Sequence, residues 1–140
     1  ANTMVKLEQR SQMITALFGV YDMQTREFSY SIAGHPEPLF VDEDGTLTEL
    51  LGSGVPLGEV FDAALVKEQS ITLPQGAAVV FYTDGLVEYA RDALEALERL
   101  QNAVRDRFFL DGEEPAQAII DAVLDGKQRD DVAVLVMRLL

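Results

Sequence analysis

The chain has 140 residues, of which 48% are hydrophobic and 25% are charged, and its formal net charge is −13 at pH 7. The length predicts one domain with its own core, and the composition is ordinary for a globular protein. The excess of acids argues against nucleic acid or an anionic membrane surface as a main partner, because phosphates would be repelled. It favours cations or a partner with a basic face, although solubility alone accounts for many surface acids.

The chain contains no cysteine and no apolar run of membrane-spanning length. Disulfides and thiol chemistry are therefore excluded, and insertion into a membrane is not expected. A reducing cytoplasm suits this composition.

The first half of the chain is predicted to form short antiparallel strands joined by tight turns. Phe28, Tyr30 and Ile32 alternate with polar residues, which is the pattern of a strand with one buried face. Residues 60–69 fit either a strand or a turn of helix. The expected strands cover residues 13–21, 27–32, 39–41, 46–51 and 70–73.

An apolar run over residues 79–82 stops abruptly near Asp84, which a glycine follows. A buried strand ends in this way when it carries one carboxylate into an open site. A second apolar run, residues 132–137, comes directly after Asp130 and Asp131. Because this run is apolar on both faces, it predicts a central place in the sheet.

If the two runs pair antiparallel, Asp84 meets Asp130 and Asp131 at one edge of the sheet. Like charges repel at close range in a poorly solvated place, so such a cluster needs a cation or hydrogen bonds. The pattern fits an all-oxygen site for Mg²⁺ or Mn²⁺, ions whose water ligands can be activated for hydrolysis. It also fits two unrelated acidic turns, and the spacing alone leaves both interpretations open.

The period of the apolar residues changes after residue 86. Apolar residues between Leu94 and Val104 recur at helical spacing. A second helix is predicted over residues 115–124, because Pro115 suits a first helical turn and Gly126 suits a C-terminal cap. Strands followed by helices and a last strand predict an α+β fold with helices packed on the sheet.

Three further features of the sequence point less clearly to a function. His35, the only histidine, lies in a loop between glycine and proline, where a surface or packing role is favoured over catalysis. The glycine-rich residues 52–58 lack the lysine with serine or threonine of a P-loop, so a turn is favoured over a phosphate cradle. Glu88 fits either a place near the acid-tipped strand or the start of a helix.

Four stretches of the chain are informative together. They are residues 33–36 (AGHP), 55–58 (VPLG), 81–88 (FYTDGLVE) and 129–136 (RDDVAVLV). Their order and rough spacing resemble those of the SpoIIE-like phosphatases, the bacterial branch of the metal-dependent protein phosphatases (the protein phosphatase 2C superfamily). The resemblance covers most of the chain, and four motifs in register are far more specific than any single one.

The resemblance implies an α-β-β-α sandwich whose aspartates hold two Mn²⁺ or Mg²⁺ ions. A metal-bridging water would attack a phosphoserine or phosphothreonine directly, without a phospho-enzyme. Asp84 matches the metal-binding aspartate of the Thr-Asp-Gly motif. Asp130 matches the first acid of the late motif, and Asp131 is its neighbour and the weaker candidate ligand.

Other motif residues are implied to lie near this site without a catalytic role of their own. Gly34 and His35 match a family loop beside the metals. Gly85 and Glu88 belong to the same stretch as Asp84.

The chain departs from the family in its early motif, an aspartate after glycine followed by aromatics and a second aspartate. Neither this motif nor the glycine-histidine-glycine loop after it occurs before Met13. We therefore expect residues 1–140 to be a single domain that lacks about its first third, in a fragment or a shortened homologue. The missing strands would expose apolar surface and favour a homodimer or a partner protein.

Two functions stay open at this point. The first is a serine/threonine phosphatase acting on a phosphorylated bacterial regulatory protein, such as an anti-sigma-factor antagonist, with sensor or receiver domains upstream. The second is a phosphatase-like regulatory module that has lost catalysis and acts through protein contacts. The retained Asp84 and Asp130 favour the enzyme, and the absent early motif favours the module.

Overall fold

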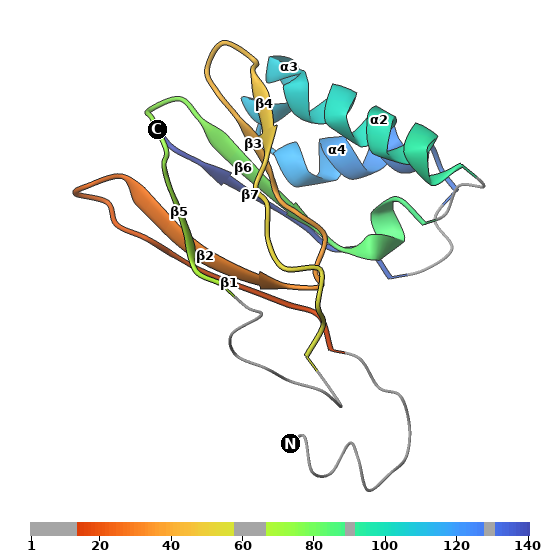
Figure 1. The fold of residues 1–140 in the computed structure, drawn as a ribbon. Coiled ribbons are helices and arrows are strands. Elements are labelled where there is room, and N and C mark those ends of the chain that lie inside the picture. Colours follow the sequence, from red (N-terminus) through yellow and green to blue (C-terminus); the bar gives the residue numbers. More distant parts are fainter. Residues whose placement is uncertain (1–13, 58–66, 89–91, 128–130) are drawn as a thin grey trace, which may run out of the picture. The chain divides into compact units, whose positions relative to one another are not determined.

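The computed structural model describes residues 14–57, 67–88, 92–127 and 131–140 of the chain (Figure 1). Two compact units are distinguished, and each is described by itself. Unit 1 comprises Ala1–Glu37 and Leu51–Leu73, and unit 2 comprises Pro38–Leu50 and Pro74–Leu140.

Unit 1 contains an antiparallel sheet of three strands in the order β1-β2-β5. Phe28, Tyr30 and Ile32 are all buried on β2, which confirms the predicted alternation. On β1 the apolar residues are less protected, and Phe18 and Val20 are 72% and 55% exposed. The strands are β1 (Ala16–Tyr21), β2 (Glu27–Ala33) and β5 (Gln69–Thr72).

Unit 2 contains a four-stranded antiparallel sheet in the order β4-β3-β6-β7. Its strands and helices follow the predicted order, and together with unit 1 they confirm the α+β class. The strands are β3 (Leu39–Val41), β4 (Leu47–Glu49), β6 (Ala78–Tyr82) and β7 (Val134–Arg138). The helices are the 3₁₀ turn η2 (Asp84–Leu86), α2 (Ala93–Arg105), α3 (Arg107–Leu110) and α4 (Pro115–Leu124).

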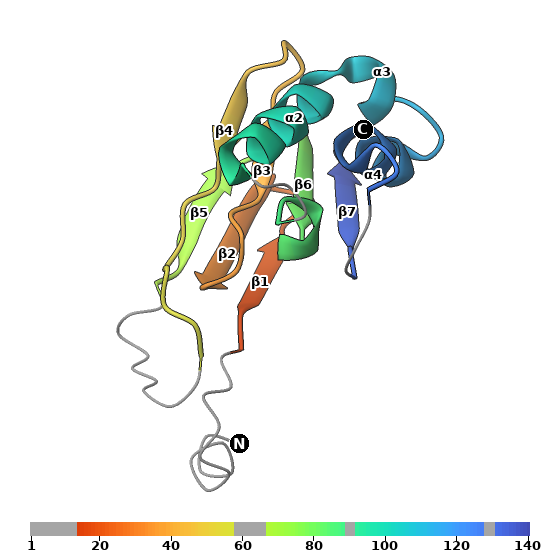
Figure 2. The same ribbon diagram turned by 90° about the vertical axis from the view of Figure 1, so that its right-hand side faces the viewer.

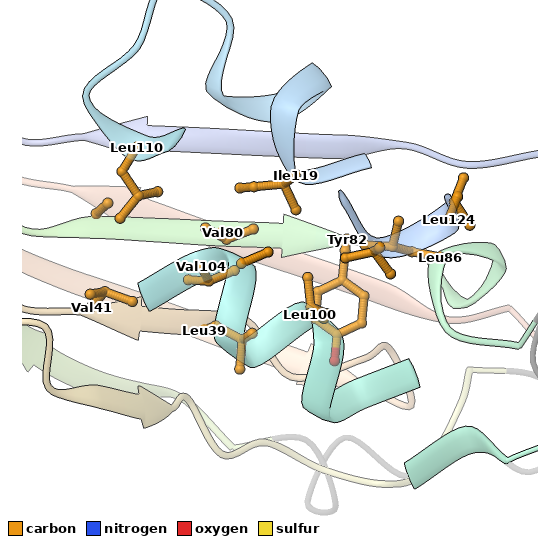
Figure 3. Packing of buried hydrophobic residues seen from close by; sticks show 13 residues of the cluster. Leu39, Val41, Val80, Tyr82, Leu86, Leu100, Val104, Leu110, Ile119 and Leu124 are labelled. Carbon is orange, nitrogen blue, oxygen red and sulfur yellow. The ribbon is translucent and has the colours of Figure 1, made fainter. Parts of the chain in front are cut away.

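The core of unit 2 lies between its sheet and its helices, with α2 and α4 on the same side of the sheet (Figures 1 and 2). Figure 3 shows Val80 and Tyr82 of β6 facing Leu100 of α2 and Ile119 of α4. These side chains are at most 7% exposed. Burial of this apolar area is the main stabilising term of the unit, because each such side chain contributes about 1.5–3 kcal/mol.

Local signals in the sequence explain where the helices begin and end. Asp92 precedes α2, and its side chain accepts hydrogen bonds from the backbone N–H groups of Leu94 and Glu95. The helix predicted over residues 115–124 is confirmed with the same bounds, and Pro115 stands in its first turn. The chain leaves α4 through two residues at positive φ, 49° at Asp125 and 76° at Gly126.

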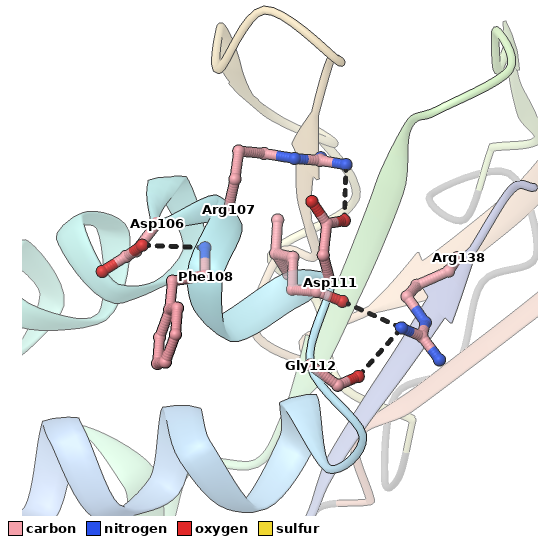
Figure 4. Close-up of polar contacts among 7 residues, drawn as sticks. Asp106, Arg107, Phe108, Asp111, Gly112 and Arg138 are labelled. Carbon is pink, nitrogen blue, oxygen red and sulfur yellow. Dashed lines mark hydrogen bonds and ion pairs between the residues drawn. The ribbon is translucent and has the colours of Figure 1, made fainter.

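The short helix α3 was not predicted, because four residues are too few to show a period. Its start is set by Asp106, whose side chain accepts from the N–H of Phe108 at 2.9 Å. Its end is held by Arg138 of β7, which donates to the carbonyl oxygens of Leu110 and Gly112 (Figure 4).

The predicted central place of the last strand is wrong. Within the part of the chain that the structure describes, β7 pairs with β6 alone and forms an edge of its sheet. Val134 and Val136 pack against the core cluster, whereas Leu135 is 64% exposed. Apolar residues on both sides of a strand report on its two faces, and they do not fix how many neighbours its two edges have.

The interval 60–69, left open from the sequence, lies mostly outside the described residues, and its last residue begins β5. Among the described helices, none is both long enough and apolar enough to cross a bilayer.

Candidate metal centre

The ends of β6 and β7 meet as the sequence predicted. The two strands pair antiparallel, and Tyr82 opposite Val134 is their last ladder pair. One residue further on, the backbone N–H of Thr83 donates to the carbonyl oxygen of Ala133 at 3.1 Å. The segment after β6 and the segment before β7 therefore leave the sheet side by side, which brings Asp84 and Asp131 to the same edge.

Gly85 shows how close this approach is. A Cβ added to Gly85 would fall on the backbone carbonyl oxygen of Asp131 and would lie 3.3 Å from a side-chain carbon of Val132. Any side chain here would push the two segments apart. The glycine of the Thr-Asp-Gly motif is thus required by the packing of one segment on the other.

The turn η2 fixes the backbone of Asp84 and leaves its carboxylate in solvent. The carbonyl oxygen of Asp84 accepts from the N–H groups of Val87 and Glu88 at 3.0 and 2.9 Å. Leu86 is fully buried and anchors the turn in the core of unit 2. The side chains of Asp84, Glu88 and Asp131 are all exposed.

This donor set fits a hard divalent cation. Ionised carboxylates offer oxygen ligands and no donor, which is what Mg²⁺ and Mn²⁺ prefer, and an exposed pair leaves room for water ligands. Asp130 lies outside the described residues. Over residues 14–57, 67–88, 92–127 and 131–140, no group of three or more His, Cys, Asp or Glu side chains is placed to hold a metal. Asp84 and Asp131 would supply part of a coordination shell.

Unit 1 brings the other two motifs together. The N–H of Gly34 donates to the carbonyl oxygen of Ser53 at 2.9 Å, and the N–H of Ser53 donates to Ile32 at 3.1 Å. Gly34 has a φ of 66°, and a Cβ added there would come within 2.8 Å of Pro56. Gly34 therefore packs the AGHP stretch against residues 55–57, the described part of the VPLG stretch, and we call these two segments the loop pair. No local signal in the sequence predicts this contact.

His35 follows Gly34 in this loop pair and is half-buried. Its Nδ1 is 3.0 Å from the carbonyl oxygen of Pro36, a distance that suits an Nδ1–H donor. Gly34 and His35 belong to unit 1, whereas Asp84, Gly85, Glu88 and Asp131 belong to unit 2. The prediction that the first pair lies near the metal site therefore stays a prediction.

Tyr30 of β2 makes a hydrogen bond to the segment that leads into the loop pair. Its hydroxyl donates to the carbonyl oxygen of Leu51 at 3.1 Å. Burial, and secondarily the negative charge of Glu37, raises the pKa of the Tyr30 phenol above its ordinary value. The phenol therefore keeps the proton that this hydrogen bond requires.

Comparison with solved structures shows the class of protein to which this fold belongs, the PP2C-type phosphatase domains. The structure of the RsbU and RsbW domains of Rv1364c from Mycobacterium tuberculosis gives a TM-score of 0.74 at 26% identity, covering 96% of this chain and 40% of that one. The phosphatase domain of the cell fate determinant SpoIIE from Bacillus subtilis, presoaked with Mn, gives 0.67 at 20% identity, covering 99% and 62%.

The family follows from the sequence itself. The family model for Stage II sporulation protein E (SpoIIE) matches residues 1–140, so the chain belongs to the SpoIIE family. The chain is also 30% identical over 134 residues to the phosphoserine phosphatase RsbU of Bacillus subtilis (strain 168). That match covers 91% of this chain and 39% of RsbU, so the chain spans less than half of that relative.

Proposed function

We propose that this chain is the larger part of a metal-dependent phosphatase domain that hydrolyses phosphoserine or phosphothreonine on a regulatory protein. Asp84 and Asp130 are the ligands we assign to Mn²⁺ or Mg²⁺, and Asp131, the next residue in the sequence after Asp130, is the weaker candidate. The resemblance of the Thr-Asp-Gly and Asp-Asp motifs to those of the family supports this assignment. So does the similarity of the chain to RsbU, a phosphoserine phosphatase.

The observation that carries the proposal is the close approach of the two strand ends. A Cβ at Gly85 would fall on the carbonyl oxygen of Asp131, so the segment that carries Asp84 packs directly on the backbone of Asp131. Two unrelated acidic turns would not require a glycine at their contact. The close packing therefore favours a shared site over the alternative of two independent turns.

Charge explains why a cation is needed here. The chain has a formal net charge of −13, and a phosphorylated side chain carries about −1.5 to −2 at pH 7. The exposed carboxylates of Asp84 and Asp131 would repel such a group. A bound divalent ion supplies an activated water and neutralises the phosphate.

The substrate we propose is a phosphorylated bacterial regulatory protein, such as an anti-sigma-factor antagonist. The family resemblance supports this choice, together with the similarity to a phosphoserine phosphatase of Bacillus subtilis. We propose that this dephosphorylation takes place in the cytoplasm. Sensor or receiver domains elsewhere in the same protein would control it.

Calorimetric titration of this chain with Mn²⁺ tests the metal site directly. We expect the wild type to bind Mn²⁺ and the Asp84→Asn variant to bind at least about 10-fold more weakly, because a ligand is lost. Asp121→Asn is the matched control, because it removes the same charge at an exposed position of α4. This variant should bind Mn²⁺ like the wild type.

Activity is tested in the full-length protein. Asp84→Asn or Asp130→Asn should lower phosphatase turnover by orders of magnitude. Unchanged turnover in either variant would contradict its assignment as a ligand.

A regulatory binding module is the second candidate, favoured by exposed apolar residues on unit 1. Phe18 and Val20 of β1 line a hollow of about 380 Å³ together with Ser29, Tyr30, Ser31 and Glu68. A surface of this kind suits a second copy of the chain or a partner protein. Folded chain that neither binds Mn²⁺ nor turns over substrate, but forms a dimer in sedimentation, would favour the module.

A further inference from the structure

Thr83, the residue between the last pair of the β6–β7 ladder and Asp84, has an unusual hydrogen-bonding role. It precedes the turn η2, and its backbone is extended, with φ −98° and ψ 160°. A threonine in this position ordinarily turns its hydroxyl to the free N–H groups of the following helix. The Thr83 side chain makes no such bond. Its hydroxyl is directed across to β7 instead.

The hydroxyl occupies a place that a backbone carbonyl would ordinarily fill. In a hydrogen-bonded antiparallel pair, each residue donates its N–H to the carbonyl of the other. The N–H of Thr83 does donate to the carbonyl of Ala133 at 3.1 Å, but the carbonyl of Thr83 accepts from Leu86 at 3.0 Å. The N–H of Ala133 donates to Oγ1 of Thr83 at 2.9 Å.

The hydroxyl, acting as acceptor in place of the backbone carbonyl, meets two geometric requirements at once. The backbone must leave the sheet at Thr83 in order to form η2, and this takes its carbonyl out of the ladder. The hydroxyl keeps Ala133, the residue before β7, attached, so the two segments stay joined one residue beyond the sheet. Gly85 then packs on Asp131. We name the hydrogen-bonded pair Thr83–Ala133 the Thr83 clasp.

We propose that Thr83 is a positioning residue, whose hydroxyl holds Asp84 and Asp131 at the spacing that a bound cation requires. This inference rests on the proposed function, because it concerns the same metal site. Thr83 precedes Asp84 directly, and Ala133 lies two residues after Asp131. A change at the clasp is therefore transmitted to both carboxylates through very few bonds.

The clasp is expected to matter more for the site than for the stability of the fold. Ala133 is exposed, so its N–H can turn to water when the hydroxyl is removed. An exposed donor that is resolvated costs little, in contrast to a buried donor left without a partner. Loss of the hydroxyl should thus loosen the strand ends without unfolding the unit.

Three variants of this 140-residue chain test the proposal. Thr83→Val keeps the shape of the side chain and removes the hydroxyl, while Thr83→Ser keeps the hydroxyl. Thr48→Val, on the exposed surface of β4 in the same unit, is the matched control. The measurements are Mn²⁺ affinity by calorimetry, exchange of the Ala133 amide by NMR, and the thermal midpoint.

We expect Thr83→Val to weaken Mn²⁺ binding about 10-fold, the loss seen when a group that orients a ligand is removed. The Ala133 amide should exchange faster, and the thermal midpoint should move no more than in Thr48→Val. Thr83→Ser should restore both affinity and amide protection.

The outcomes separate this inference from the proposed function. Unchanged exchange of the Ala133 amide in Thr83→Val would overturn the clasp, whether or not metal binds. Faster exchange with unchanged Mn²⁺ affinity would overturn the positioning role alone. A wild-type chain that binds no Mn²⁺ would overturn the metal site, and with it the role of Thr83 toward the cation.

Discussion

The two units use similar strands in different ways. In unit 2, β6 has the sequence AVVFY, and its residues Val80 and Tyr82 are buried beneath the helices. In unit 1, β1 has the sequence ALFGVY, yet Phe18 and Val20 stay exposed. Among the residues that the structure describes, unit 1 has no helix over its sheet.

The difference teaches that an apolar strand does not create its own burial. Val80 and Tyr82 of β6 are buried because α2 and α4 cover their face of the sheet. Equally apolar residues of β1 meet no such cover within unit 1 as described. Composition therefore identifies which strands need a partner layer, and the structure identifies which of them have one.

The largest effect is expected in the covered core. Leu100→Ala removes a fully buried side chain of α2 and should lower the free energy of unfolding by about 2–5 kcal/mol. Leu94→Ala makes the same change on the same helix at a site that is 77% exposed, and should change stability by no more than about 0.5 kcal/mol. Urea denaturation followed by circular dichroism measures both.

Phe18→Ala tests the effect of the same kind of truncation on the exposed strand β1 of unit 1. We expect a change of no more than about 0.5 kcal/mol, since this ring is 72% exposed. A loss as large as that of Leu100→Ala would mean that β1 is covered in solution, and the contrast between the units would then fail.

An intermediate effect is expected at the start of α2. Asp92→Ala removes the acceptor for the N–H groups of Leu94 and Glu95, 3.0 and 3.4 Å away, and should cost about 0.5–2 kcal/mol. Asp92→Ser keeps a capping oxygen and should recover most of the loss. Hydrogen exchange should accelerate in α2 and stay unchanged in the β1–β2 hairpin; equal acceleration in both would argue against separate units.

The smallest effect should be alike in both units, because it depends on turns and not on burial. Backbone N–H groups of Thr25 and then Gln24 lower the pKa of Asp22, and the N–H of Thr46 lowers the pKa of Asp44. A lowered pKa contributes stability above the unfolded value of 3.8 that is lost as the pH falls through the folded value.

The turn aspartates are tested by thermal melts between pH 5 and pH 2. Asp22→Asn and Asp44→Asn should each make the acid side of the stability curve shallower. A curve as steep as that of the wild type in either variant would show that its turn contributes nothing to the pH dependence.

Much of the fold could be predicted because its signals are local. Pro115 and Gly126 predicted α4 with its observed bounds, and the alternation from Phe28 to Ile32 predicted the buried face of β2. The meeting of the strand ends could be predicted too, since it needs only that two apolar runs pair antiparallel.

The rest depends on contacts between residues far apart in the chain. The edge position of β7 is set by what pairs with it, which its own residues do not record. The packing of Gly34 on Pro56 joins two loops that local rules treat separately. Thr83 looked like a polar residue at the end of a strand, and only the positions of Leu86 and Ala133 show why a hydroxyl is needed there.

The order of the strands in unit 2 also has a consequence for biosynthesis. Thr83 and Ala133 are 50 residues apart in the chain, so β6 leaves the ribosome well before its neighbour β7. At a synthesis rate of about 5–20 residues per second, the delay is roughly 3–10 s. During that interval β3 can protect only one edge of the most apolar strand of the sheet. Under the proposed function, the acids on either side of the cation would likewise come together only after β7 has been made.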